Sequence, residues 1–298
     1  MSTPVDLADY QHQLGPVLIG RGTTVDIRAI EGLGQVALRS SDVEPPGEDG
    51  LWLGPDYYGG RTVRIDAAVK NSGNSAAVLD TVALLQDASD TAAVRGQAGT
   101  TLDLRVKFPG RPARVLRGRL RKFEPDLTTL KHGYVPLDLE FQTADHRYYA
   151  DTSDSTSMPL GGLTEGGVTF PLQMPFTIEG DPSAVGRPGY IQVDGSAPTW
   201  PVIRVNGPCA NPIITHVTSG RTLTVQTTMT AGEWVEIDTR PGWRTVLREN
   251  GGSVPLAPTS RIDQFVLTPG LNEIRWSATD NTLTSTLAVT WWPAYKAL

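Results

Sequence analysis

The sequence has little of what would support a disulfide framework, a thiolate metal site or a membrane span. Cys209 is the one cysteine among 298 residues, so the chain forms no internal disulfide and builds no zinc site from several thiolates. No stretch approaches the ~18 consecutive apolar residues of a transmembrane helix, and we expect no membrane insertion. The opening residues, MSTPVDLADYQHQLG, contain no apolar run and do not read as a signal peptide.

Charge is also scarce. Charged residues make up 19% and hydrophobic residues 39% of the chain, below the usual averages of about 25% and about 45–50%. The net charge of −6 excludes a general electrostatic attraction to nucleic acid or anionic membranes. Glycine and proline, 31 and 23 residues, exceed ordinary usage without reaching the level typical of disorder. We therefore expect a folded, turn-rich protein.

The motifs of common enzyme classes are missing. There is no Gly-x-Ser-x-Gly elbow, no phosphate-binding loop and no His-Glu-x-x-His. The four histidines, at positions 12, 132, 146 and 216, form no i, i+3 or i, i+4 pair, and we expect them in polar loops or at the surface. A metal site assembled from residues distant in the sequence stays an alternative. Cys209 is predicted to be a structural thiol, and the chain is predicted to be no enzyme and to use no metal or cofactor.

Short strands and one helix fill the first half. Period-two alternation predicts strands at residues 23–30, 61–69, 101–108, 113–123 and 135–142. Residues 74–93 instead place Val78, Val82 and Leu85 at helical spacing, and Leu79, Leu84 and Ala88 widen that stripe. Asn74 or Ser75 is the predicted N-cap.

The second half reads as an antiparallel sandwich. Turn signals recur every 8–12 residues between eight short predicted strands. These strands cover residues 190–193, 201–205, 222–227, 233–238, 244–247, 264–267, 272–277 and 284–290. A small, polar, glycine-rich stretch precedes them. We therefore expect a first domain at 1–150, a linker at 151–165 and a second domain at 166–298.

A basic cluster, Arg111–Lys122, is the clearest charge feature. Its alternation predicts a strand with one basic face and a bulge at Gly118. One interpretation is a contact with an acidic partner or nucleic acid. The other is a solvated face paired with acidic neighbours such as Asp103 and Asp138. Because the domain is not basic overall, protein contact or the solvated face is favoured over nucleic acid.

Six of the seven tryptophans lie in the second half. An exposed, coplanar set would stack on sugar rings, whereas buried ones would pack between sheets. Trp234 and Trp276 alternate with apolar neighbours, so structural roles are expected for most of them.

The first half resembles the N-terminal domain of siphovirus distal tail proteins. The matching residues are Ile19-Gly20, Gly22-Thr23, Gly32-Leu33-Gly34, Arg39-Ser40-Ser41-Asp42, the segment Gly54–Arg61, the helix and a strand ending in Phe141 near Asp145. The second half resembles the siphovirus-type tail component C-terminal domain. The matching segments there are Pro201–Gly207, Gly232–Thr239, Leu267–Ile274 and Val289–Tyr295.

This resemblance implies a mainly β protein of the virion. Its N-terminal β-sandwich or split barrel, with one α-helix, would build a homo-hexameric ring at the phage tail tip. Its C-terminal galectin-like β-sandwich would project outward. The implied partners are the tail tube protein, the tail-tip hub and receptor-binding or fibre proteins, and DNA would pass through the bore without specific binding. The protein would be made in the host bacterial cytoplasm. The resemblance implies no catalytic residue.

A closed ring needs complementary patches on opposite sides of each subunit. The basic strand, through Arg114, Arg117, Arg119 and Arg121, is the candidate subunit interface, and the acid-rich segments 42–49 and 87–90 are its candidate complement. Because a basic bore would bind phosphate, we do not place this strand on the bore. The alternative functions are a carbohydrate-binding host-attachment module in the C-terminal sandwich and a cell-wall hydrolase.

Overall fold

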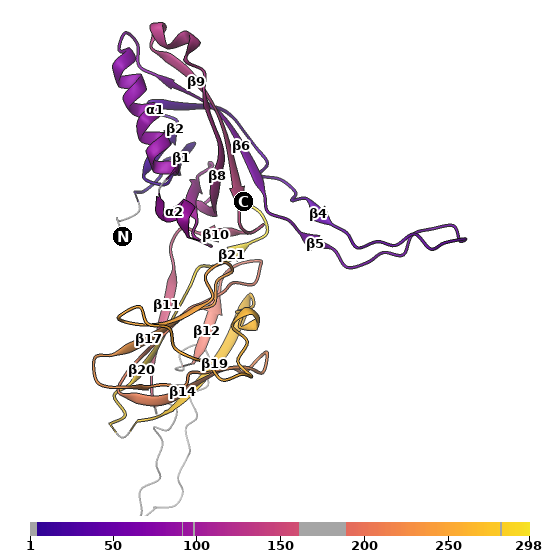
Figure 1. Cartoon of the computed structure of the whole chain (residues 1–298), viewed down its shortest axis with the longest axis vertical. Helices are drawn as coiled ribbons and strands as arrows, with labels where there is room; N and C mark the ends of the chain where they lie inside the picture. The colour runs from indigo at the N-terminus through magenta and orange to yellow at the C-terminus, as the bar shows by residue number, and fades with distance from the viewer. Residues whose placement is uncertain (1–4, 91, 98, 161–188, 281) are drawn as a thin grey trace, which may run out of the picture. The chain divides into compact units, whose positions relative to one another are not determined.

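The computed structural model describes residues 5–90, 92–97, 99–160, 189–280 and 282–298. The chain divides into two compact units. The first comprises Met1–Asp151 together with Tyr295–Leu298, and the second comprises Thr152–Ala294. Figure 1 shows a fold dominated by strands in both units, which confirms the mainly β prediction.

A large antiparallel sheet organises the first unit. In pairing order its strands are β2 (Val17–Gly20), β1 (Gln11–Leu14), β7 (Leu102–Val106), β8 (Arg114–Pro125), β9 (Tyr134–Thr143), β6 (Thr62–Lys70) and β3 (Val25–Glu31). The short strand β10 (Tyr148–Ala150) pairs with β8. The five strands predicted for this half are confirmed to within two residues at each end.

Helix α1 (Ser75–Ser89) begins where the sequence predicted. Asn74 is the N-cap, and its side-chain oxygen accepts a hydrogen bond from the backbone N–H of Ala77. The helix ends at Ser89, short of residue 93, and a one-turn helix α2 (Ala92–Gly96) follows. Near residue 126 the chain forms a 3-10 helix, η1 (Leu127–His132), capped by Asp126.

The buried stripe of α1 is narrower than predicted. Its buried residues are Val78, Val82, Leu85 and Ala88. Leu79 and Leu84, which were expected to widen the stripe, are 41% and 55% exposed. The prediction for these two residues is wrong. Each directly neighbours a buried residue in the sequence, and successive residues are rotated by about 100° around a helix, so both side chains point away from the core.

The core of the first unit lies between the sheet and α1. Leu116, Leu139 and Phe141 from the middle strands are fully buried there, together with Leu14 of β1 and Leu85 of α1. Because strand side chains alternate, the other face of β6, β8 and β9 carries the charged residues. The fold thus leaves one face of this sheet polar.

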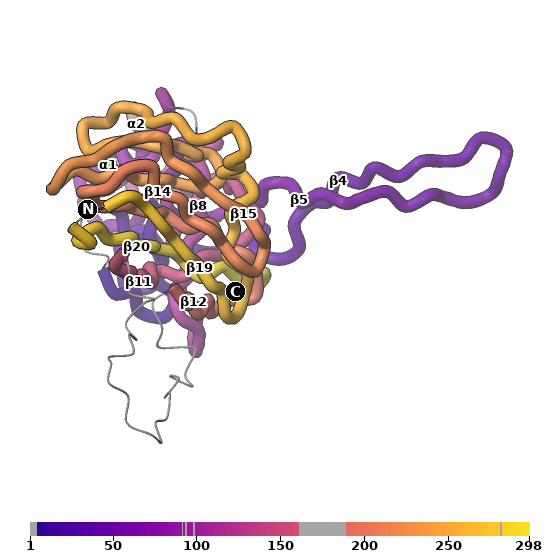
Figure 2. Tube along the Cα trace, turned by 90° about the horizontal axis from the view of Figure 1, so that it is seen from below, coloured from indigo at the N-terminus to yellow at the C-terminus, as the bar shows by residue number. Residues whose placement is uncertain are grey.

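A long two-stranded arm, residues 35–60, leaves the first unit between β3 and β6 (Figures 1 and 2). Its strands β4 (Leu38–Arg39) and β5 (Tyr57–Tyr58) pair antiparallel, and an isolated bridge joins Val43 to Trp52 nearer the tip. The arm has two legs, one that follows β3 and one that leads back to β6. The segment Gly54–Arg61, one of the segments that carry the family resemblance, lies in the second leg.

The second unit contains two antiparallel sheets. One has the order β11 (Asp154–Pro159), β20 (Thr286–Trp291), β13 (Val202–Asn206), β17 (Trp234–Asp238) and β18 (Thr245–Arg248). The other has the order β12 (Tyr190–Val193), β19 (Gly270–Thr279), β14 (Cys209–His216) and β15 (Arg221–Thr224), and β16 (Thr228–Met229) also pairs with β14. The last strand, β21 (Ala294–Tyr295), spans the point where the chain returns to the first unit.

The expected linker at 151–165 needs correction. Residues 154–159 form strand β11, which pairs with β20 along its whole length. The sequence did not predict this strand because it shows no alternation of apolar and polar residues. Ser, Thr and Asp fill most of its positions, and Met158 alone is buried. Residues 161–165 lie outside the described part of the chain.

The apolar faces of the second unit's sheets share one core. It includes Ile203, Val235 and Leu287 from one sheet, and Ile214 and Ile274 from the other. Trp291 is buried in this core and Trp276 packs against it, so these two have the structural role that was expected for most of the tryptophans. The prediction of a strand at 264–267 is wrong, because residue 264 belongs to the 3-10 helix η3 (Ile262–Gln264).

The helices in the described ranges are too short or too polar to cross a membrane.

Candidate functional site

The basic strand β8 runs through the middle of the first unit's sheet, between β7 and β9. Leu116 is fully buried and Leu120 packs against the core. Alternation therefore turns Arg117 and Arg119 to the opposite, polar face. These two arginines share one face, as the sequence predicted, whereas Arg114 lies on the side of Leu116, opposite the buried Val106.

The bulge lies further along β8 than Gly118. The register with β9 shifts between Leu120 and Lys122. At Gly118 the chain instead approaches β9 closely, because an added Cβ atom would lie 2.1 Å from the carbonyl oxygen of Gln142. Glycine at this position is therefore needed for strand packing.

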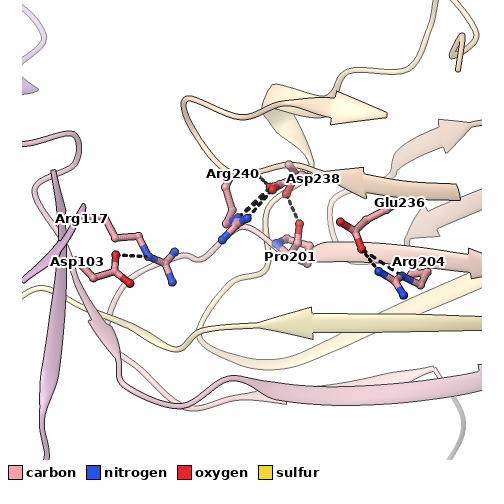
Figure 3. A network of polar contacts seen from close by, with 8 residues as sticks. Asp103, Arg117, Pro201, Arg204, Glu236, Asp238 and Arg240 are labelled. Atoms are coloured by element: carbon pink, nitrogen blue, oxygen red, sulfur yellow. Dashed lines mark hydrogen bonds and ion pairs between the residues drawn. The ribbon is translucent and has the colours of Figure 1, made fainter. Parts of the chain in front are cut away.

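All four candidate interface arginines make contacts within the first unit, and two of them, Arg114 and Arg117, lie over aromatic rings. The guanidinium of Arg114 stacks on the ring of Tyr295, 3.6 Å from its centroid. Arg117 lies over the ring of Tyr149 and forms an ion pair with Asp103, with 3.8 Å between Nε and Oδ1 (Figure 3). The side chain of Arg117 is only 17% exposed.

Arg119 and Arg121 border an open depression of about 360 Å³. Its other lining residues are small or polar, and they include Thr100, Thr101 and Gln142. Arg119 donates from Nε to the carbonyl of Thr100 at 2.9 Å. Arg121 is exposed and donates to Oε1 of Gln142 at 3.3 Å. The depression thus presents guanidinium groups over a floor of small side chains.

The end of the basic strand is paired with carboxylates. Lys122 Nζ lies 2.5 Å from Asp138 and 3.0 Å from Glu124. The hydrogen bond to Asp138, followed by that to Glu124, raises the pKa of Lys122 above its ordinary value. Both acidic neighbours named from the sequence, Asp103 and Asp138, therefore form pairs with β8. The solvated-face interpretation fits this end of the strand.

A buried polar network fixes the root of the arm, and sequence reasoning did not identify it. Arg61 is 3% exposed. Its guanidinium donates to the carbonyls of Gly32, Gly34 and His146 and lies 4.6 Å from the ring centroid of Tyr148. Burial lowers the pKa of Arg61, although an arginine remains charged. One guanidinium therefore holds both legs of the arm to the loop after β9.

Position 32, whose carbonyl accepts one of the hydrogen bonds from Arg61, requires glycine. Gly32 has φ +82°, and an added Cβ atom would lie 2.0 Å from the carbonyl oxygen of Thr62. A side chain here would be strained by the positive φ and would collide with the backbone of β6.

Asp145 completes the arm root. Burial by itself would raise the pKa of its carboxyl, but hydrogen bonding with His146 and Tyr149 and the charge of Arg147 hold that pKa well below the usual range. Burial, followed by the charge of Asp145, raises the pKa of the Tyr149 hydroxyl. The ring of His146 also stacks on Tyr58 of the arm, with 4.5 Å between centroids.

Two histidines expected in loops or at the surface are buried. His12 is 3% exposed, and burial lowers its pKa to about 4. His216 is fully buried, with Nδ1 2.7 Å from Ser219 Oγ and Nε2 3.1 Å from Asn272 Oδ1. Their polar sequence context did not indicate burial, because their partners are supplied by other strands and loops.

The described residues contain no group of three or more His, Cys, Asp or Glu side chains that could hold a metal ion. Cys209 is 3% exposed. Burial, followed by the nearby charge of Asp280, raises the pKa of its thiol to about 11. A thiol in this state is protonated at neutral pH and is a poor nucleophile, as a structural role requires.

Charged residues on β13 and β17 of the second unit form ion pairs, and of their carboxylates Glu236 is partly exposed whereas Asp238 is buried. Arg204 lies 2.7 Å from Glu236 and 4.1 Å from the ring centroid of Trp234. Arg240 binds the carboxylate of Asp238 through Nε and Nη2 (Figure 3). A guanidinium that lies over a tryptophan ring occupies a face on which a sugar would stack.

Comparison with known proteins identifies what these units are similar to. Residues 194–295 match the family model described as siphovirus-type tail component, C-terminal domain. No curated protein matches the chain.

Solved structures match most of the chain. The crystal structure of SPP1 Dit (gp 19.1), described as "a Paradigm of Hub Adsorption Apparatus in Gram-positive Infecting Phages", is 16% identical, and the match has a TM-score of 0.58 and covers 94% of this chain and 97% of that one. The phage P2 baseplate in its activated conformation with Ca matches with a TM-score of 0.55, 11% identity and the same coverage of both chains.

These findings confirm the resemblance noted in the sequence. The family model covers most of the second unit, and the fold of nearly the whole chain is similar to that of SPP1 Dit.

Proposed function

We propose that the protein is a structural component of a siphovirus tail tip, of the distal tail or baseplate-hub type. The observation that carries this proposal is the fold similarity to SPP1 Dit over 94% of this chain and 97% of that chain. The family match at residues 194–295 supports it independently, because it rests on sequence. The protein would then reside in the virion.

In this role the first unit forms a homo-hexameric ring. The ring joins the tail tube to the tail-tip hub and receptor-binding parts, and DNA passes through its bore without specific binding. The net charge of −6 suits such passage, because an acidic protein does not hold phosphate. The second unit serves as an attachment domain for neighbouring tail components.

The candidate interface narrows to Arg121, which is the exposed member of the four. Arg114, Arg117 and Arg119 make contacts within the first unit, so reversing their charge would also disturb folding. Arg121 is exposed at the strand surface. We expect Arg121→Glu to weaken ring assembly without unfolding the subunit.

Native mass spectrometry and negative-stain imaging of the purified full-length chain test the ring. The expected result is a hexamer with a central hole. A chain that stays monomeric at high concentration, both alone and with its tube and hub neighbours, would overturn the proposal.

The carbohydrate-binding alternative is not favoured by the second unit. Trp291 is buried, and Arg204 lies over the ring of Trp234. A glycan array with the full chain checks this conclusion, and specific binding of a sugar would reinstate the alternative.

A further inference from the structure

The polar face of the first unit's sheet balances charges between neighbouring strands. Five of its basic side chains form ion pairs with a carboxylate of the adjacent strand: Arg28 with Asp66, Arg64 with Glu140, Lys70 with Asp26, Lys122 with Asp138 and Arg117 with Asp103. Arg119 and Arg121 are different. Their hydrogen bonds within the described chain go to carbonyl and amide oxygens, and none goes to a carboxylate.

These two arginines line the same open depression of about 360 Å³. None of the described residues that line it is acidic. Two guanidinium groups at one site repel each other, and no carboxylate among those lining residues offsets the repulsion. A bound anion would attract both groups and offset it.

Both guanidinium groups are held by the protein itself. Arg119 donates from Nε to the carbonyl of Thr100 at 2.9 Å and from Nη2 to the carbonyl of Gln97 at 2.5 Å. Arg121 donates from Nε to Oε1 of Gln142 at 3.3 Å. A guanidinium has five N–H donors, so Nη1 of Arg119 and both terminal nitrogens of Arg121 keep donors that no described residue uses. The depression therefore presents oriented, unused cationic donors.

Uncharged donors lie beside the two arginines. Thr100 and Thr101, which carry hydroxyl groups, line the depression, and so does Gln142 with its side-chain amide. Because Oε1 of Gln142 accepts from Arg121, the amide nitrogen is the group that remains to donate. Gly118, another lining residue, has no side chain to fill the space. A small anion thus finds both charge and neutral hydrogen-bond donors at one place.

The number and arrangement of donors favour phosphate over a carboxylate. A carboxylate has two oxygens in one plane, and a single guanidinium satisfies both in a bidentate pair. A phosphate group carries more negative charge at neutral pH and has three strong acceptor oxygens. Two guanidinium groups can therefore bind one phosphate together, and arginine is well suited to phosphate geometry.

From these observations we infer that the Arg119–Arg121 depression is a phosphate-binding site. Its ligand is inorganic phosphate or a phosphate group of a nucleotide chain, which share the same oxyanion chemistry. The site belongs to one subunit and requires no second copy of the chain, so it goes beyond the proposed ring.

Isothermal titration calorimetry of the full chain with inorganic phosphate tests the site. The buffer contains no other multivalent anion, and sodium chloride keeps the ionic strength constant, because salt screens exposed charges. We expect saturation at one phosphate per chain. Arg121→Gln should raise the dissociation constant about tenfold, since it removes the charge-assisted hydrogen bonds of one guanidinium.

Two further variants separate the depression from general charge. Arg111→Gln removes the same charge from an exposed residue of the same basic cluster that lies outside the depression, and it should leave the dissociation constant unchanged. Arg121→Lys keeps the charge but loses the planar fork of donors, and it should recover only part of the affinity. Circular dichroism of each variant should match the original chain.

A second probe identifies the source of the phosphate. A short single-stranded oligonucleotide without a terminal phosphate carries phosphate groups only in its backbone. Tighter binding of this oligonucleotide than of inorganic phosphate, weakened by Arg121→Gln, would identify a nucleotide chain as the ligand. Equal or weaker binding of the oligonucleotide would identify the free ion. Both results support the site.

Three results would overturn the phosphate site. They are no saturable binding of either phosphate probe, equal affinity for acetate and phosphate, and equal losses of phosphate affinity in Arg111→Gln and Arg121→Gln. A chain that forms the ring but binds neither phosphate probe would overturn the site and leave the ring intact.

Discussion

Replacing Arg61 with methionine should loosen the arm root and destabilise the first unit. The variant removes three hydrogen bonds to backbone carbonyls and the contact with the ring of Tyr148. Hydrogen bonds to charged groups contribute about 1.5–3 kcal/mol each. The desolvation cost of the guanidinium disappears with the charge, which offsets part of the loss. We expect the unfolding free energy of the first unit to fall by about 3–5 kcal/mol.

Arg64→Met, three residues further along the chain, is the matched control. Arg64 is 66% exposed and pairs with Glu140 at 3.1 Å. A surface pair of this kind contributes about 0–1 kcal/mol. Arg61 directly precedes β6 and Arg64 lies within it, three residues further along the chain, so they differ mainly in burial and partners.

Hydrogen exchange is the suitable assay, because six of the seven tryptophans lie in the second half and fluorescence would report mainly on the second unit. The most protected amides of β6 and β9 should exchange about two to four orders of magnitude faster in Arg61→Met than in the original chain. Arg64→Met should change them little. Equal protection in the two variants would refute the role assigned to Arg61.

Three other results are expected. Leu85→Ala should lower the unfolding free energy of the first unit by about 2–5 kcal/mol, whereas Leu84→Ala should change it by less than about 0.5 kcal/mol in chemical denaturation, because Leu85 is buried and Leu84 is 55% exposed. His12 has a folded pKa of about 4, below its unfolded value of 6.5. The unfolded chain therefore binds more protons between these values, and stability should fall by about 2 kcal/mol from pH 7 to pH 5. His12→Gln should flatten this pH dependence, and an unchanged slope would contradict the assignment. Cys209 should resist a thiol reagent in the native chain and react once the second unit is unfolded, which mass spectrometry of the labelled protein would show.

Strands with a clear two-residue period could be predicted from sequence, because each has one buried and one solvated face. β6 alternates Val63, Ile65 and Ala67 with polar residues, and the structure keeps that pattern. β14 was missed because Asn211 and Pro212 interrupt its pattern, although Ile214 and His216 lie in the core. The strand tolerates the interruption because its register with β19 shifts between Ala210 and Ile213.

The arm shows what periodicity cannot reveal. Residues 35–60 have no buried face to impose an alternating pattern, so only turn residues and acidic residues stood out. The buried network at its root joins Arg61 to carbonyls 27 and 29 residues earlier and 85 residues later. Every residue has a backbone carbonyl, so no sequence motif could have indicated which carbonyls bind Arg61.

The sequence by itself determined the mainly β class, the long helix α1 and the location of the basic strand. These features follow from composition and from local alternation, which each stretch of chain carries within itself. Only the tertiary structure decided which arginines of β8 remain at the surface, that His12 and His216 are buried, and that an acidic arm projects from a fixed root. Burial and pairing depend on residues distant in the chain, and folding alone brings those together.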